Sequence, residues 1–321
     1  MKTDPQKHIK EDLKELELQL KESISSEVDL ATEVSSYIVK SGGKRIRPTI
    51  TILVARALKY RGKELINLAT AIELLHTATL IHDDVVDQSE IRRGKTSIHK
   101  KWDNAHGVLV GDFVYSKAFQ LMASLKNKRI IQTLANSTNR ISEGEVLQLN
   151  FLESNNIKET DYFEIIGRKT AELFKASAHT AALLAEAEEN LIKISCQFAY
   201  ALGIVFQLKD DLLDYSGNEL KTGKRIGKDF LEGKITLPLI QAFNLASPDD
   251  LKIIKKAFES RDKRKLQEVI NIIAKSGAVE EVEKITKGYC EKCLILLDKF
   301  PHSIYTESLR EVVTNLRERS E

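Results

Sequence analysis

The segment "ELINLATAIELLHTATLIHDDVVD" (residues 64–87) decides the fold. Apolar residues cover nearly every face of its 3.6-residue helical period, which is typical of a helix in the centre of a bundle rather than on its rim. The segment "FAYALGIVFQLKDDLLD" (residues 198–214) has the same character. The chain therefore contains two predicted buried helices, and each of them ends in aspartates.

The flanking sequence also predicts helices. Apolar residues recur at steps of three and four over residues 9–20 and 309–316, which places them on one helical face. No proline lies between Pro48 and Pro238, whereas a sheet protein would need frequent turn residues. No segment reads as an interdomain linker, so we expect one all-α domain over residues 1–321.

Composition excludes several classes of protein. The net charge of +2 gives no overall attraction to nucleic acid or to an anionic membrane. Cys196, Cys290 and Cys293 are too few for a disulfide scaffold, and C-x-x-C at 290–293 lacks the second pair that zinc would need. No run reaches the roughly 18 apolar residues of a transmembrane helix, and the N-terminus lacks a signal peptide's apolar core. We therefore expect a cytoplasmic protein.

Two acidic clusters share the spacing D-D-x-x-D. The first comprises Asp83, Asp84 and Asp87, and the second comprises Asp210, Asp211 and Asp214. In each cluster the first and last aspartates share a helical face. One such cluster is common on solvated helices, but two at the ends of apolar helices favour a metal site. Oxygen ligands select Mg²⁺ or Ca²⁺, and Mg²⁺ usually completes its shell with substrate phosphate.

Three basic segments flank predicted helix ends: "SGGKRIRP" (41–48), "IRRGK" (91–95) and "KTGKRIGKDFLEGK" (221–234). They could be solvated loops, but two of them closely follow the aspartate clusters. Arginine and lysine are the side chains that bind phosphate oxygens. An acidic metal site, basic clamps and an apolar interior together predict a ligand with a diphosphate head and an apolar tail.

Seven motifs occur in this order along the chain: GGKRIRP, ELLHTATLIHDDVVDQSEIRRGK, GDFVYSKAF, EGEVLQL, GRKTAELF, FQLKDDLLDY and GKDFLEGKITLPL. In these motifs the sequence resembles the trans-polyprenyl diphosphate synthases, and it is most like their bacterial octaprenyl-forming members. The resemblance implies a transferase with about ten core helices around a deep central cavity. It also implies a homodimer that condenses isopentenyl diphosphate 1′-4 onto an allylic diphosphate.

The resemblance also implies roles for individual residues. It places two or three Mg²⁺ ions on Asp83, Asp87, Asp210 and Asp214. It places isopentenyl diphosphate on Lys44, Arg47, His76 and Arg93, and the allylic diphosphate on Arg92, Lys169, Lys224 and Lys234. Thr170 and Gln207 match groups near the developing carbocation, and Asp84 and Asp211 complete the catalytic set.

Two small residues bear on product length. Ala78 and Thr79 lie five and four positions before Asp83, where short-chain members of the family carry a bulky aromatic residue. We therefore expect a channel that continues beyond a C15–C20 tail, with farnesyl diphosphate as the primer. The expected product is all-trans, about C40 (octaprenyl) within a C30–C50 range, and supplies quinone side chains. Its release could involve transient membrane contact.

Several alternatives compete with this interpretation. A metal phosphohydrolase would use the His82-Asp83 doublet, but it needs further histidine ligands and gives the second aspartate cluster no role. A terpene cyclase usually lacks an isopentenyl site like the one at Lys44, Arg47 and Arg93. A non-catalytic subunit of a heteromeric synthase typically loses one aspartate motif, and both are intact here. A shorter-chain (C15–C20) synthase remains a further alternative.

Overall fold

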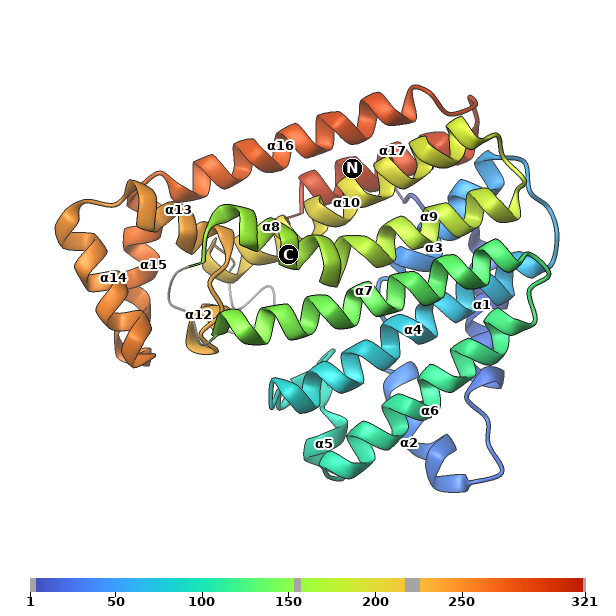
Figure 1. Cartoon of the computed structure of the whole chain (residues 1–321), viewed down its shortest axis with the longest axis horizontal. Coiled ribbons are helices and arrows are strands. Elements are labelled where there is room, and N and C mark those ends of the chain that lie inside the picture. The colour runs from blue at the N-terminus through green and yellow to red at the C-terminus, as the bar shows by residue number, and fades with distance from the viewer. Residues whose placement is uncertain (1–3, 153–156, 217–225, 320–321) are drawn as a thin grey trace.

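The computed structural model describes residues 4–152, 157–216 and 226–319. Long helices dominate it and lie roughly along the length of the molecule, which confirms the all-α prediction (Figure 1). The helices of the first half are α1 (Lys10–Ser23), α2 (Asp29–Val39), α3 (Ile46–Ala57), α4 (Glu64–Val86), α5 (Ile98–Lys101), α6 (Asn104–Ala123), α7 (Lys128–Leu152) and α8 (Glu159–Ile166).

The second half continues with a π-helical turn, η1 (Gly167–Ala171), which runs directly into α9 (Glu172–Leu184). The helices that follow are α10 (Glu189–Ser216), α12 (Lys228–Leu231), α13 (Leu237–Leu245), α14 (Pro248–Ser260), the 3₁₀ turn η2 (Lys263–Lys265), α15 (Leu266–Lys275), α16 (Ala278–Leu297) and α17 (Ile304–Arg317). The predicted helices at residues 64–87 and 198–214 correspond to α4 and to the second half of α10.

Helices α4 and α10 occupy the interior, as their uniform apolarity predicts. Helix α4 packs against α1, α3, α6 and α9, and α10 packs against α9 and α16. By length and composition both could cross a membrane, but 67% and 61% of their most apolar windows are buried by the rest of the protein. They therefore have the environment of core helices in a soluble protein.

A short β-hairpin follows α4. Strands β1 (Ile91–Arg92) and β2 (Lys95–Thr96) pair antiparallel, with Arg92 opposite Lys95. The two turn residues, Arg93 and Gly94, have φ of 51° and 74°. Positive φ at both positions is the requirement of a tight hairpin turn, which explains the glycine. The hairpin projects two adjacent arginines beside the end of α4.

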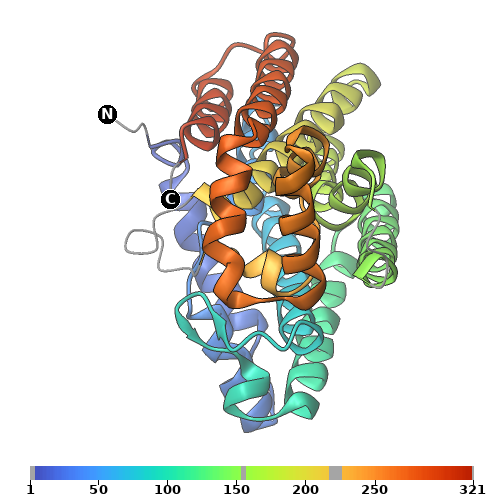
Figure 2. The same cartoon turned by 90° about the vertical axis from the view of Figure 1, so that its left-hand side faces the viewer.

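The C-terminal ends of α4 and α10 lie at the same end of the molecule, at the left of Figure 1 and towards the viewer in Figure 2. The short helix α12 lies beside them at this end. The ammonium of Lys228 in α12 donates to the Ser89 hydroxyl, just after α4, at 3.4 Å. The fold therefore gathers the two aspartate-bearing helix ends and the basic segment that follows α10.

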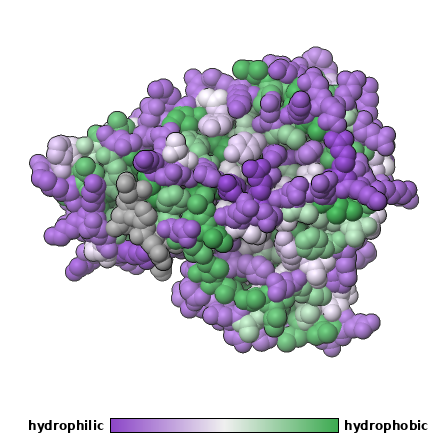
Figure 3. Space-filling model, viewed as in Figure 1, coloured by the Kyte–Doolittle hydropathy of each residue, from purple (hydrophilic) through white to green (hydrophobic). Residues whose placement is uncertain are grey.

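The face of the molecule shown in Figure 3 carries an apolar band. On the face shown in Figure 3, apolar side chains gather over α6 and α7. Helix α6 exposes Val108, Leu109 and Phe119, and α7 exposes Val146 and Leu149. An apolar band of this kind on a polar surface usually marks a site of protein contact.

Candidate active site

The first aspartate cluster occupies the last turn of α4. The Asp87 carboxylate accepts a hydrogen bond of 2.8 Å from the Lys234 ammonium, and Asp83 lies 3.9 Å from the Lys169 ammonium. Asp84 points elsewhere: it is buried and forms an ion pair of 2.6 Å with Arg92 of the hairpin. As the i, i+4 spacing predicts, Asp83 and Asp87 share one face, and Asp84 fixes the hairpin to α4.

Burial and charge both act on Asp83. Burial raises its pKa; the Lys169 charge opposes the rise and the Asp87 charge adds to it. In this buried environment the ionised form of the Asp83 carboxylate needs a nearby cation to stabilise it. In this structure lysine ammonium groups supply that charge.

The second aspartate cluster lies in the last turns of α10, and its three members have different partners. Asp211 is buried and accepts hydrogen bonds from the Tyr162 hydroxyl at 2.5 Å and the Gln207 amide at 2.8 Å. Asp214 accepts the backbone N–H groups of Lys228 and Asp229 at 3.1 and 3.0 Å, at the start of α12. Asp210 lies 3.3 Å from the Arg319 guanidinium.

Crowded carboxylates surround this cluster. Burial and then the charge of Asp229 raise the pKa of Asp214 to about 7. Burial also raises the pKa of Asp229 to about 6; Lys234 opposes the rise and Asp210 adds to it. Burial and Asp229 likewise raise the pKa of Asp211 well above its usual range. Such a concentration of acids favours the binding of additional positive charge.

Lys234 connects the two clusters. Its ammonium contacts Asp87 at 2.8 Å and Glu232 at 2.9 Å, and it faces the charge of Asp229. Burial would lower its pKa, but the charges of Asp87 and Glu232 outweigh burial and raise it. Asp229 in turn feels the charge of Asp210, so Lys234 is linked directly to the first cluster and electrostatically, through Asp229, to the second.

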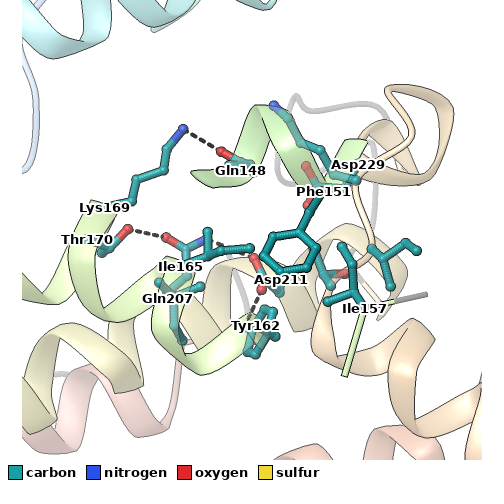
Figure 4. A pocket seen from close by; sticks show the side chains of 14 residues that line it. Gln148, Phe151, Ile157, Tyr162, Ile165, Lys169, Thr170, Gln207, Asp211 and Asp229 are labelled. Carbon is teal, nitrogen blue, oxygen red and sulfur yellow. Dashed lines mark hydrogen bonds between the residues drawn. The ribbon is translucent and has the colours of Figure 1, made fainter. Parts of the chain in front are cut away.

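A cavity of about 120 Å³ opens between α7, α8, η1, α10 and the segment before α13 (Figure 4). It brings together five of the predicted residues: Lys169, Thr170, Gln207, Asp211 and Lys234. The apolar part of its wall includes Phe151, Ile157, Ile165, Ile166 and Ile235. The wall of the cavity therefore combines charged and polar groups with apolar side chains.

Hydrogen bonds fix the polar wall of the cavity. The Thr170 hydroxyl donates to the Gln207 carbonyl oxygen at 2.8 Å, and this orients the amide so that its NH₂ group donates to Asp211. Lys169 donates to Glu145 at 2.6 Å and to Gln148 at 2.9 Å. These bonds leave the oxygens of Thr170 and Gln207 at the cavity, where they can face a cationic centre.

A second group of basic residues lies around His76, in the middle of α4. The Arg47 guanidinium lies 3.1 Å from the His76 Nε2. Burial and then the charge of Arg47 lower the pKa of His76 well below its usual range, so the neutral ring can accept this hydrogen bond. Burial lowers the pKa of Arg47 to about 10; the Glu73 charge opposes this shift and Arg93 adds to it.

This basic group suits a multiply charged anion. The buried Nε of Arg47 has no hydrogen-bond partner among the described residues. Arg93 donates to the Gly42 carbonyl and lies 3.9 Å from Glu73. Lys44 is exposed at the edge of the same loop. Apart from Glu73, the groups that face Arg47 electrostatically are themselves basic, so an anion would offset their repulsion.

Arg45, which the sequence placed among the phosphate-binding candidates, has a different role. It is buried and forms ion pairs of 2.6 Å with Glu17 and 2.7 Å with Glu73. Its side chain joins α1 to α4 inside the protein. Its two carboxylate partners hold it in the interior, so among the basic residues of segment 41–48 Arg45 serves a structural role.

The remaining predicted residues divide into three groups. Lys224 lies outside the described residues. Arg92 lies beside the first aspartate cluster through its pair with Asp84. Ala78 is fully buried, and Thr79 is half-buried with its hydroxyl bonded to the His76 carbonyl at 2.8 Å. The role of Ala78 and Thr79 in product length stays a prediction.

The structure also adds residues that sequence reasoning missed. Tyr162 contacts Asp211, Arg319 contacts Asp210, and Glu73 faces Arg93. No local pattern marks them, because each partner is distant along the chain. Asp229 does lie in a quoted motif, GKDFLEGK, where an acidic residue in an otherwise basic segment was the available signal.

The donor set fits magnesium. Within residues 4–152, 157–216 and 226–319, no three metal-ligating side chains already converge on one point. The contacts explain this, because lysines face Asp83 and Asp87 and backbone amides occupy Asp214. Carboxylate oxygen donors nonetheless suit a hard divalent cation. Asp83, Asp87 and Asp210 are the residues that would hold it.

Comparison with known proteins identifies the family of this chain. A sequence profile of the family described as polyprenyl synthetase matches residues 28–275. The octaprenyl diphosphate synthase of Escherichia coli (strain K12) is 40% identical over 289 residues, which cover 90% of each chain.

Solved structures of other proteins also resemble the fold of this chain. A polyprenyl synthase from Caulobacter crescentus CB15, complexed with calcium and isoprenyl diphosphate, superposes with a TM-score of 0.95 at 34% identity, covering 99% of this chain and 97% of the other. A decaprenyl diphosphate synthase from Rhodobacter capsulatus superposes with a TM-score of 0.93 at 35% identity, covering 99% and 98%.

Proposed function

The chain belongs to the polyprenyl synthetase family and is a prenyltransferase, and from this premise we propose that it is a long-chain all-trans polyprenyl diphosphate synthase. It adds isopentenyl diphosphate repeatedly to an allylic diphosphate, for which we expect farnesyl diphosphate. The observation that carries this proposal is the cavity in which Lys169 and Lys234 stand beside the two aspartate clusters. The aspartates and lysines suit a diphosphate bound with metal, and the apolar side chains of the cavity suit an apolar tail.

The allylic diphosphate binds at the end of α4. Arg92, Lys169 and Lys234 hold its oxygens, and the two lysines leave their carboxylates as they do so. Magnesium, when bound to Asp83, Asp87 and Asp210, supplies the positive charge that stabilises the departing diphosphate. The allylic carbon–oxygen bond breaks, and its electron pair leaves with the diphosphate.

The carbocation that remains needs a shielded and oriented environment. Thr170 and Gln207 direct oxygen lone pairs towards it, and their mutual hydrogen bond keeps them in place. Aliphatic side chains such as Ile165 and Ile235 exclude the water that would quench it. The double bond of isopentenyl diphosphate then attacks the cation, and the released diphosphate takes the proton that the adduct loses.

Isopentenyl diphosphate binds at the second basic group. Arg47 and Arg93 contribute guanidinium groups, His76 holds Arg47 in orientation, and Lys44 covers the open edge. Arginine suits this task because its planar fork binds two phosphate oxygens at once. The two basic groups use different residues, so we expect both diphosphates to bind at the same time.

The product chain grows along α4 past Thr79 and Ala78, where small side chains leave room for it. We propose a product of about C40, for quinone side chains. The name of the Escherichia coli relative, an octaprenyl synthase, supports this length, whereas that of the Rhodobacter capsulatus structure, a decaprenyl synthase, supports a longer one. Each added isoprene unit contributes hydrophobic stabilisation of roughly 0.8 kcal/mol per buried CH₂.

We also propose that the enzyme is a cytoplasmic homodimer of one-domain subunits. The apolar band formed by Val108, Leu109 and Phe119 of α6 and Val146 and Leu149 of α7 would be covered by the same band of a second copy (Figure 3). A tail as long as C40 is poorly soluble in water, so transient contact with a membrane at product release fits the chemistry.

One incubation tests the proposed function. The protein is mixed with Mg²⁺, radiolabelled isopentenyl diphosphate and farnesyl diphosphate, and the lipid products are sized. Labelled chains of about C40 are expected. Products of C15–C20 would support a short-chain synthase, free phosphate without elongation would support a hydrolase, and unchanged label would support a non-catalytic subunit.

A further inference from the structure

The π-turn η1 carries two residues of the cavity. Such turns insert an extra residue into a helix and occur frequently at functional sites. Lys169 and Thr170 are consecutive in η1, and both reach partners that line the cavity: Lys169 contacts Gln148, and Thr170 contacts Gln207. The irregular backbone therefore presents two adjacent side chains to one site.

Two glycines from different helices approach the backbone of this turn. A Cβ atom built on Gly144 of α7 would lie 2.9 Å from the backbone nitrogen of Lys169 and 2.8 Å from the Arg168 Cβ. A Cβ atom built on Gly203 of α10 would lie 2.6 Å from the Ala171 Cα. These neighbours are backbone or Cβ atoms that cannot rotate aside, so either methyl group would displace the turn.

Glycine is otherwise unfavourable inside a helix, because it loses more backbone freedom on folding than alanine does. Both glycines nonetheless lie within long helices, α7 and α10, that contact η1. Gly288 of α16 provides the contrast, since nothing lies within 4 Å of a Cβ built there. Gly107 and Gly111 of α6 also have close neighbours, but these are side-chain atoms of Val85 and His82, whereas Gly144 and Gly203 approach the backbone of the π-turn itself.

We propose that Gly144 and Gly203 are positioning residues that hold η1 from two sides and so place Lys169 and Thr170 for the allylic diphosphate. Gly144 fixes the backbone at Lys169, and Gly203, one turn before Gln207, fixes the spacing of the Thr170–Gln207 hydrogen bond. This inference rests on the proposed function, because that function assigns Lys169 and Thr170 to the allylic substrate.

The test compares Gly144→Ala and Gly203→Ala with the control Gly288→Ala. Displacing a reacting group by about 1 Å can cost on the order of 100-fold in rate. We therefore expect kcat/KM for farnesyl diphosphate to fall roughly 10- to 100-fold in the two variants. The KM for isopentenyl diphosphate should stay unchanged, because Arg47, His76 and Arg93 lie on other elements.

A second readout does not need turnover. Calorimetry with magnesium and inorganic diphosphate should show weaker binding to Gly144→Ala than to Gly288→Ala. All values are taken on folded protein isolated by size exclusion and checked by circular dichroism. Variants that match Gly288→Ala in both readouts, or that weaken both substrates equally, would overturn this inference alone. An unmodified protein that neither elongates nor binds diphosphate would overturn the proposed function and this inference together.

Discussion

The ammonium of Lys234 lies 2.8 Å from the Asp87 carboxylate, although 147 residues separate the two in the chain. This contact joins the segment after α12 to the end of α4, and Asp229 brings the second aspartate cluster to the same lysine. This lysine thus offsets the negative charge of Asp87 and Glu232, and Asp229 adds to the acidic surroundings. In the proposed function, it would move to a diphosphate oxygen when magnesium binds the carboxylates.

Replacing this lysine should lower activity, and it should also lower stability because the Asp87 carboxylate loses its ion-pair partner. Lys234→Gln removes a cation that stabilises the leaving diphosphate, and loss of one such preorganised group typically costs about 100- to 1,000-fold in kcat. Steady-state kinetics with farnesyl diphosphate would measure the loss. Lys252→Gln, on the exposed surface of α14, serves as control. Equal activity of the two variants would contradict the role given to Lys234.

The adjacent arginines Arg45 and Arg47 should respond differently to replacement. Arg45→Met leaves Glu73 buried without its closest cation, and breaking a buried ion pair in this way costs about 3–5 kcal/mol of unfolding free energy. Arg47→Met should cost much less stability, because no carboxylate among the described residues lies within ion-pair distance of Arg47. Denaturant unfolding would measure both.

For Arg47→Met the expected defect is kinetic. Loss of a charged hydrogen bond is worth about 1.5–3 kcal/mol, so the KM for isopentenyl diphosphate should rise roughly 10- to 100-fold. The KM for farnesyl diphosphate should change little. The opposite pattern, with Arg45 controlling the KM and Arg47 the stability, would show that the two roles are reversed.

Product length should depend on Ala78. Ala78→Phe places a large ring where the growing tail is proposed to pass, so we expect products of about C15–C20 in place of about C40. Because Ala78 is fully buried, the larger side chain should also cost about 1–3 kcal/mol of stability. Thr79→Ser, which preserves a small side chain, is the control. If folded Ala78→Phe makes products of unchanged length, the growing chain does not pass along this face of α4.

The tyrosine that contacts the second aspartate cluster should contribute to stability. Tyr162→Phe removes the hydroxyl that donates to buried Asp211 and leaves the Gln207 amide as its other side-chain donor among the described residues. We expect a loss of about 1–3 kcal/mol in unfolding free energy. Tyr305→Phe, which keeps its ring beneath Arg61, controls for the substitution itself. Identical melting of the two variants would exclude a stabilising role for the hydroxyl.

Local patterns in the sequence were enough to predict the main features of the fold. Uniform apolarity over residues 64–87 predicted a central helix, and α4 is one. The i, i+4 spacing predicted that Asp83 and Asp87 share a face, and both are approached by lysine ammonium groups there. These features follow from the period of a helix, which depends only on neighbouring residues.

Other features depend on contacts between distant segments and left no local signal. The burial of Arg45 requires Glu17 and Glu73, which are each 28 residues away. The π-turn at residues 167–171 follows from how α7 and α10 pack around it, and periodicity alone predicts a regular helix there. Tyr162 reaches Asp211 across 49 residues. Such pairs appear only once the helices are assembled.

The central claim is that Asp83, Asp87 and Asp210 share magnesium with one diphosphate. Crystals grown with Mn²⁺ and a non-reactive thio analogue of farnesyl diphosphate test it directly through anomalous scattering from the metal. We expect metal peaks in contact with Asp83 and Asp87 on α4 and with Asp210 on α10, bridged by the diphosphate. Lys169 and Lys234 should contact phosphate oxygens. Metal bound to one cluster alone, or a diphosphate bound away from both, would contradict it.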